Sequence, residues 1–113
     1  MDYLGSITGY LTLPFMAVGA QGVISVASNV IPRQVAKMVS AFARGRVAEA
    51  QRLHAQYYPL FKDLFIETNP TPVKAALAMM GQIGNELRLP LVPISEASTK
   101  KLRATLRACK VLK

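Results

Sequence analysis

A mostly apolar run at residues 22–29, GVISVASN, predicts a short strand. The run is rich in β-branched residues and lies between Gly22 and Pro32, which is typical of a strand buried on both faces. A single strand cannot satisfy its own backbone donors and acceptors. Because the remaining pattern predicts no second strand, we expect this one to need neighbours that the chain does not supply.

Three segments around the strand have the apolar pattern of helices. Residues 10–18 are nearly all apolar and end at Gly19, which predicts a short buried helix before the strand. A second helix is predicted from Pro32 to Gly45, with an apolar stripe at Val35, Met38, Val39 and Phe42. A third is predicted from Val47 to Leu64, with a length of roughly 17 to 19 residues.

Prolines divide the second half of the chain. The segment 65–72, FIETNPTP, predicts a connector in which Thr71 caps the next helix and Pro72 opens it. Residues 87–93 contain two more prolines and are expected to be extended, and Ser95 is expected to cap a last helix. The helix–strand–helix unit in the first half indicates an α/β fold with a parallel sheet, followed by an all-helical region.

Composition and charge narrow the class of protein. The 113 residues fit one domain, and no apolar run reaches the ~18 residues of a membrane span. Without a signal-peptide pattern and with one cysteine, we expect a cytoplasmic protein that has no membrane partner. The net charge is +8, with six cations after Thr99, but no aromatic residue lies among them to stack on bases. We therefore expect a solvated basic face and no nucleic-acid partner.

The ionisable residues do not form a catalytic or metal-binding pattern, so no metal or cofactor is expected. His54 is expected at the edge of the core, and Cys109 is expected to be a core thiol because it lacks a His or Cys partner at metal spacing. Asp63 and Glu67 straddle a predicted helix end and are expected to be solvated. Lys74 has two interpretations, a Schiff-base nucleophile or a structural lysine, of which the structural one is favoured.

Three stretches of the sequence resemble the C-terminal part of the dihydrodipicolinate synthase/N-acetylneuraminate lyase family. They are LTLPFMAVGAQGVISVASNVIPRQVAKM at 11–38, PLFKDLFIETNPTPVKAALAMMGQI at 59–83 and LRLPLVPISEAS at 87–98. Residues 65–74 resemble the family's FxEPNPxPVK segment, with Thr68 where proline is usual. This segment favours the dihydrodipicolinate synthase branch over sister Schiff-base aldolases.

The resemblance implies the C-terminal fragment of a (β/α)8 TIM barrel together with a C-terminal helical domain. Residues 1–46 would hold the helix after strand seven, strand eight and helix eight, and residues 47–113 would form the helical domain. The resemblance further implies a homotetramer that condenses pyruvate with L-aspartate 4-semialdehyde in lysine (diaminopimelate) biosynthesis. In that reaction a barrel lysine forms an imine with pyruvate.

By the same resemblance, little of the active site lies in this chain. Ile24 matches the isoleucine whose backbone contacts bound pyruvate, with Gly22 and Val23 supporting it. The imine-forming lysine, the proton-relay tyrosines and the carboxylate-binding arginine belong to earlier barrel strands, so we expect no catalytic residue here. Residues 6–10, SITGY, replace the family's Gly-Asp-Asp, so strand seven is expected to be absent or altered.

Several functions stay open. The chain could be the C-terminal segment of this synthase, inactive without a polypeptide that supplies the lysine, or a segment of another pyruvate-dependent aldolase of the family. It could instead be a non-catalytic remnant or a helical oligomerisation module, or an unrelated basic helical binding protein. In isolation we expect it to aggregate or to form oligomers because its strand edges and barrel helices would be exposed, with the region after Val47 best ordered.

Overall fold

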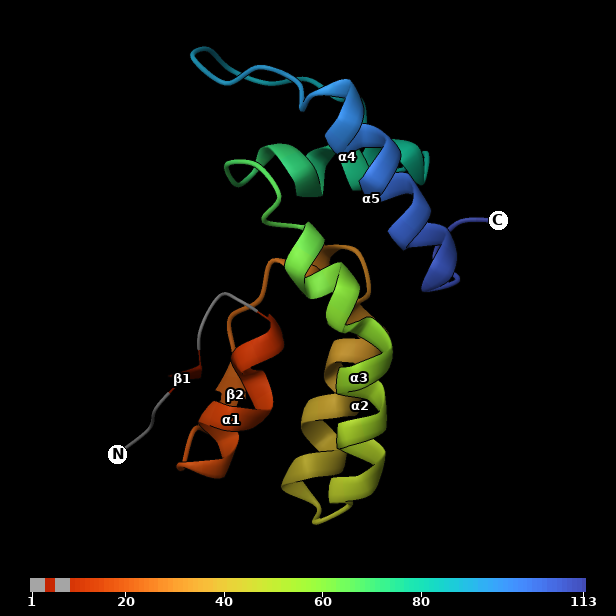
Figure 1. Cartoon of the computed structure of the whole chain (residues 1–113). Helices are drawn as coiled ribbons and strands as arrows, with labels where there is room; N and C mark the ends of the chain where they lie inside the picture. The colour runs from red at the N-terminus through yellow and green to blue at the C-terminus, as the bar shows by residue number, and fades with distance from the viewer. Residues whose placement is uncertain (1–3, 6–8) are drawn as a thin grey trace.

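The computed structural model of this chain describes residues 4–5 and 9–113 (Figure 1). Its elements are β1 (Leu4–Gly5), the 3-10 helix η1 (Gly9–Leu11), α1 (Thr12–Ala17), β2 (Gly22–Val23), the 3-10 helix η2 (Ala27–Asn29), α2 (Pro32–Ala43), α3 (Val47–Asp63), α4 (Thr71–Met79) and α5 (Glu96–Ala108). Figure 1 shows α2 and α3 side by side as a helical hairpin, with β1, β2 and α1 on one side of it. Helices α4 and α5 lie across the end of the hairpin where α3 finishes.

The predicted eight-residue strand is wrong in length, because the regular strand covers only Gly22–Val23. The hydroxyl of Ser28 donates to the carbonyl of Ser25 at 2.5 Å, and the amide Nδ2 of Asn29 donates to the carbonyl of Val26 at 3.0 Å. Such side-chain bonds to the local backbone favour a turn over an extended ladder. The end of the predicted strand therefore folds into η2.

The strand also has a neighbour, which the sequence pattern did not predict. Leu4 pairs with Gly22 and Gly5 pairs with Val23 in a parallel register, so β1 precedes α1 as a very short strand. A departure from the family pattern is also predicted at residues 6–10. Of these, residues 6–8 lie outside the described residues. In the described part of the chain β1 is the only partner of β2, so one edge of β2 stays open.

The strand is not buried on both faces, which corrects the prediction. Both of its residues are half-buried, and the side chain of Ile24, directly after it, is 57% exposed. The strand is therefore open at one edge, and its side chains are only partly covered.

The predicted helices of the first half agree with the structure. Helix α2 ends before Gly45, whose φ of +78° suits a glycine after a helix end. Helix α3 has 17 residues, within the expected length. The predicted helix at 10–18 is divided into η1 and α1, which ends at Ala17, and Gly19 follows with a φ of +107°.

The core lies along α3. This helix packs against α2, α5 and η1, so it joins the first half of the chain to the last helix. A Cβ atom at Gly9 would lie 2.5 Å from Cδ1 of Phe61, so η1 approaches α3 where only glycine fits. The largest fully buried side chains include Phe61, Met38, Leu60, Leu64, Leu102 and Leu106.

Two carboxylates bind α5 to the end of α3 and to the connector that follows. The expectation of solvation is wrong for Asp63, which is buried, whereas Glu67 is only half-buried. Asp63 is 5% exposed, and its Oδ2 accepts a hydrogen bond from the hydroxyl of Thr105 at 2.5 Å. Oε2 of Glu67 accepts from the backbone amide of Ser95 at 2.9 Å and from its hydroxyl at 3.1 Å. Hydrogen bonds from Ser98 and Ser95 lower the pKa of Glu67.

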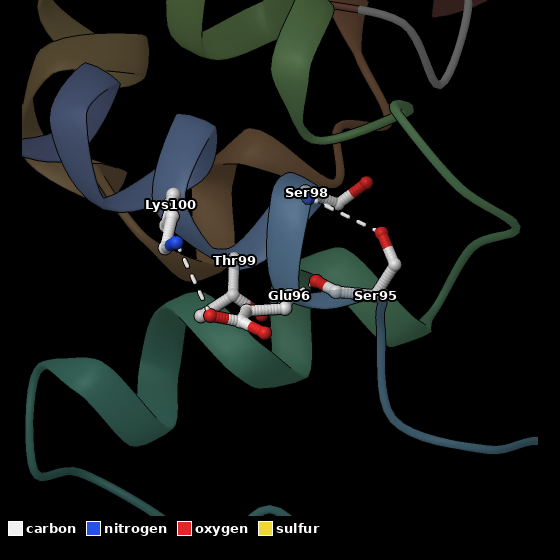
Figure 2. A network of polar contacts seen from close by, with 5 residues as sticks. All are labelled: Ser95, Glu96, Ser98, Thr99 and Lys100. Carbon is white, nitrogen blue, oxygen red and sulfur yellow. Dashed lines mark hydrogen bonds and ion pairs between the residues drawn. The ribbon is translucent and has the colours of Figure 1, made fainter.

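The predicted cap of the last helix is confirmed (Figure 2). The hydroxyl of Ser95 accepts from the backbone amide of Ser98 at 3.2 Å, and the hydroxyl of Thr99 donates to the Ser95 carbonyl at 2.9 Å. Lys100 Nζ lies 3.1 Å from a carboxylate oxygen of Glu96, one helical turn before it. The first turn of α5 is thus held by side chains on both sides of its N-terminus.

The start of α4 differs from the prediction. Thr71 is the first residue of the helix, and its hydroxyl donates back to the carbonyl of Thr68 at 2.6 Å instead of capping the helix. Between α4 and α5, residues 84–94 contain neither helix nor strand. The expected extended segment 87–93 is wrong at its centre, because the chain turns at Leu89–Pro90, where the amide of Leu91 donates to the carbonyl of Arg88 at 3.0 Å, and Leu89 is 88% exposed. No helix in the described residues is long and apolar enough to cross a membrane.

Candidate functional site

The segment predicted to contact substrate, Gly22 to Ile24, ends at the carboxyl edge of the small parallel sheet. Because β1 and β2 run parallel, their carboxyl ends meet at the same edge. Ile24 directly follows the last residue of β2 and is exposed. The carboxyl edge of a parallel sheet is where α/β folds bind their ligands, since backbone groups there face open space.

Ser25 adds a polar group that the sequence pattern did not single out. Its hydroxyl is buried and has no hydrogen-bond partner among the described residues, while its carbonyl accepts from Ser28. A buried hydroxyl without a partner is uncommon in folded proteins. In the sequence, only its position next to Ile24 points to Ser25. The burial of its hydroxyl oxygen depends on the turn that follows β2, which the residue pattern does not predict.

An apolar groove lies beside the same segment and is called here the β2–α2 groove. Its volume is about 380 Å³, and it is lined by Val23, Ser28, Pro32, Val35, Ala36, Val39 and Ser40. The side chains from α2 include small ones, Ala36 and Ser40, so a neighbouring backbone can approach closely. An apolar face beside an open strand edge is typical of a surface that another element covers.

His54 lies on α3, as predicted at the edge of the core. Its ring contacts those of Tyr58 and Phe61, with centroid distances of 5.9 and 6.2 Å. Burial lowers the pKa of His54 because the charged imidazolium loses hydration. Among residues 4–5 and 9–113, the ring contacts found are aromatic, which is the geometry of a packing residue.

Cys109 and Lys74 have structural surroundings. Cys109 is a buried thiol, as predicted, and burial raises its pKa, which disfavours the reactive thiolate. The ammonium of Lys74 donates to the backbone carbonyl of Glu86 and so links α4 to the segment between α4 and α5. This contact agrees with the structural interpretation of Lys74.

The described residues bring no nucleophile and base together at the carboxyl edge of β2. Within residues 4–5 and 9–113, no three His, Cys, Asp or Glu side chains gather in a way that could hold a metal ion. What this edge offers is the backbone of residues 22–24 and one hydroxyl at Ser25. Such groups can bind and orient a small polar ligand, but they cannot form a covalent adduct with it.

The chain was compared with known proteins. A sequence model described as the Dihydrodipicolinate synthetase family matches residues 3–109. The 4-hydroxy-tetrahydrodipicolinate synthase of Thermosipho africanus is 56% identical over 97 residues, which cover 86% of this chain and 33% of that protein. The chain thus spans about one third of the length of this relative.

Solved structures give the same result. The 4-hydroxy-tetrahydrodipicolinate synthase of Methylacidiphilum fumariolicum SolV superposes with a TM-score of 0.93 at 51% identity, over 96% of this chain and 36% of that one. A monomeric dihydrodipicolinate synthase variant superposes with a TM-score of 0.90 at 45% identity, over 93% of this chain and 35% of that one. The arrangement of helices and of the β1–β2 pair is therefore shared with a part of these enzymes.

Proposed function

The chain belongs to the dihydrodipicolinate synthetase family, and from that premise we propose that it is the C-terminal segment of a 4-hydroxy-tetrahydrodipicolinate synthase. The complete enzyme would condense pyruvate with L-aspartate 4-semialdehyde in lysine (diaminopimelate) biosynthesis, and a cytoplasmic location goes with that role. The observation that carries this proposal is the family match over residues 3–109, which includes β2 and the accessible edge at Ile24.

In this proposal the role of the chain at the active site is carried by backbone. The main chain at Ile24 contacts pyruvate, and Gly22 and Val23 hold that main chain through their pairing with β1. A main-chain group loses no side-chain rotamer freedom when it contacts a ligand, so this part of the entropic cost of binding is avoided. The hydroxyl of Ser25, one residue further on, is buried without a hydrogen-bond partner among the described residues.

No catalytic residue is assigned to these 113 residues. The imine-forming lysine would lie in the part of the enzyme that this chain does not span, which is about two thirds of the length of the Thermosipho africanus relative. Lys74 is engaged with the carbonyl of Glu86, which supports its exclusion as the nucleophile. Turnover would therefore require a polypeptide that carries the remaining barrel.

The β2–α2 groove is where that remaining barrel would attach. The open edge of β2 can pair with one more parallel strand, and the groove can receive the helix that follows it. In this proposal residues 1–46 form the barrel part and residues 47–113 the helical domain. A homotetramer is proposed for the complete enzyme, although the monomeric variant among the similar structures shows that a relative can exist without that assembly.

Borohydride trapping tests the proposed division of roles. The chain is incubated with pyruvate and sodium borohydride, alone and together with a polypeptide carrying the unmatched part of the Thermosipho africanus enzyme. Mass spectrometry is expected to show no reduced adduct on the chain alone, and an adduct on the added polypeptide in the mixture. A pyruvate adduct on the isolated chain would contradict the assignment of the lysine to the other polypeptide.

The backbone role of Ile24 is tested in the same mixture by a matched pair of variants. Ile24→Pro removes the amide hydrogen and restricts φ, whereas Ile24→Val keeps both the backbone and an apolar side chain. We expect the proline variant to raise the KM for pyruvate and the valine variant to leave it near the wild-type value. Equal KM values in the two variants would remove Ile24 from the proposed site.

Other functions are distinguished by the same material. A mixture that traps pyruvate but does not accept L-aspartate 4-semialdehyde would indicate another pyruvate-dependent aldolase of the family. A chain that stays folded and self-associates but never supports trapping would favour a helical oligomerisation module or a non-catalytic remnant. The well-buried leucines of α3 and α5 are the observation in favour of such a module, since they form a core without the missing barrel: Leu60, Leu64, Leu102 and Leu106.

A further inference from the structure

A second cleft lies between α2 and α3, and basic side chains line it. Its volume is about 380 Å³, and it is called here the α2–α3 cleft. The antiparallel hairpin places the start of α2 beside the middle of α3. The lining residues used below are Arg33 and Lys37 from α2 and Arg52, Leu53, Gln56 and Tyr57 from α3.

Cations from two helices thus face one space. Arg33 and Lys37 are one helical turn apart on α2, and Arg52 and Gln56 are one turn apart on α3, so each pair points the same way from its helix. Leu53 is buried and contributes an apolar surface between the charged walls. The cleft therefore combines positively charged rims with an apolar base.

Most of this charge is uncompensated. Lys37 lies 3.6 Å from Glu49, which it shares with Arg46 at 3.5 Å. Among the described residues, neither Arg33 nor Arg52 has a carboxylate within ion-pair distance. Two guanidinium groups on opposite walls are thus free to bind an anion.

The placement of Arg33 goes against the local preferences of a helix. It lies in the first turn of α2, which contains no acidic residue, and the N-terminus of a helix disfavours positive charge. It also lies four residues before Lys37, a like-charge spacing that destabilises a helix. An anion bound between the two helices would relieve both repulsions at once.

Tyr57 adds a donor at the base of the cleft. Its side chain is 8% exposed, and its phenolic oxygen accepts a hydrogen bond from Nε2 of Gln56 at 3.3 Å. The phenolic group keeps its own hydrogen as a donor, and Tyr57 is among the residues that line the cleft. The polar lining is dominated by donors, which suits an oxygen-rich anion.

We propose that the α2–α3 cleft binds a phosphate group, either inorganic phosphate or the phosphate of a small organic ester. Guanidinium forks match phosphate oxygens in bidentate geometry, and two of them on opposite walls favour a dianion over a monocarboxylate. The apolar base at Leu53 would accommodate the organic part of an ester. This site is independent of the proposed synthase role, so either can fail without the other.

Calorimetric titration of the full 113-residue chain with sodium phosphate at constant ionic strength tests the proposal. The expected result is saturable binding that weakens about tenfold in Arg33→Gln and in Arg52→Gln, because each removes a charge-assisted hydrogen bond. Arg33→Lys keeps the charge but loses the fork and is expected to weaken binding less. Arg88→Gln, an equal charge change in the segment between α4 and α5, is the matched control and is expected to bind as wild type.

Circular dichroism establishes that each variant keeps the wild-type helix content before titration, and Arg33→Lys keeps the test informative if a glutamine variant is disturbed. A parallel titration with phenyl phosphate distinguishes the two sources, since tighter binding than inorganic phosphate assigns an organic ester. Absence of saturable phosphate binding would overturn the proposal. Equal weakening in Arg88→Gln and the cleft variants would also overturn it, since it would show general charge screening.

Discussion

The ring of His54 is packed where its charged form is poorly solvated. Nδ1 is buried without a hydrogen-bond partner among the described residues, and the ring contacts Tyr58 and Phe61. Tyr58 in turn contacts Tyr10 at a centroid distance of 6.1 Å, so the aromatic cluster joins η1 to α3. Burial lowers the pKa of His54 from 6.5, and the neutral imidazole is therefore the form that the fold stabilises.

The lowered pKa of His54 predicts a loss of stability in mild acid. As the pH falls below 6.5, the unfolded chain binds a proton at His54 before the folded chain does, so the free energy of unfolding decreases until the folded pKa is passed. Urea unfolding at about pH 7.5 and about pH 5.5 measures this change. His54→Phe keeps an aromatic ring without the titration and is expected to lose less stability over this interval. The same loss in both proteins would mean that another group causes it.

Single residues also mark the limit of prediction from sequence. The places of His54, Cys109 and Lys74 could be predicted because each lies at a fixed position relative to an apolar stripe. The orphan hydroxyl of Ser25 and the facing arginines of the α2–α3 cleft could not be predicted in that way. Both depend on which segments face each other in space, and helix periodicity does not contain that information.

At the scale of elements, the start of α5 is a junction between two connectors. Ser95 caps the helix through its hydroxyl, and Glu67 from the segment after α3 accepts from the same residue (Figure 2 shows the cap). The FIETNPTPVK segment at 65–74 therefore has a structural role, because three of its side chains form hydrogen bonds: Glu67 with Ser95, Thr71 with Thr68, and Lys74 with Glu86.

Removing this cap is expected to destabilise the helical part. Ser95→Ala deletes the acceptor for the Ser98 amide and should lower the free energy of unfolding by about 1 kcal/mol. Ser95→Thr keeps a hydroxyl and is expected to retain most of the stability. Urea unfolding followed by circular dichroism measures both variants. An alanine variant as stable as wild type would show that the cap contributes nothing to stability.

The elements also show why helices were predicted better than strands. The apolar stripes of α2 and α3 repeat over several turns, so periodicity identifies them and their glycine ends. β1 has two residues, too few for any period, and it was missed. The apolar character of the residues after β2 predicts a strand. In the structure, the side chains of Ser28 and Asn29 bind the local backbone and favour a turn instead.

At the scale of the whole molecule, apolar surface is exposed beside the open edge of the sheet and again in the segment between α4 and α5. The β2–α2 groove and Ile24 adjoin the open strand edge, whereas α3 and α5 bury their apolar faces against each other. The core between α3 and α5 is thus covered, whereas apolar side chains stay exposed both beside the sheet, at Ile24, and between α4 and α5, at Leu89 and Val92. The arrangement of the helices could be predicted from the resemblance. The exposed surfaces could not, because exposure depends on which segments pack against each other.

A charge placed in the groove is expected to prevent assembly with the remaining barrel. Val39→Lys puts an ammonium on the α2 wall of the β2–α2 groove, and Val47→Lys makes the same substitution at an exposed position at the start of α3. Size-exclusion chromatography of each variant mixed with the barrel polypeptide should show co-elution for Val47→Lys and none for Val39→Lys. Co-elution of both would place the contact elsewhere.

The parallel pairing of β1 with β2 has a consequence for cooperativity. Its two residue pairs, Leu4 with Gly22 and Gly5 with Val23, close a loop in the chain. Loop closure costs chain entropy, and the few hydrogen bonds of so short a ladder compensate for little of that cost. A strand added to the open edge of β2 would restrict the backbone conformations of Gly22–Val23. It would thereby also stabilise their pairing with β1. Attachment at one edge and ordering of the carboxyl end at Ile24 are then linked equilibria, so that a binding partner and a small ligand would each raise the affinity for the other.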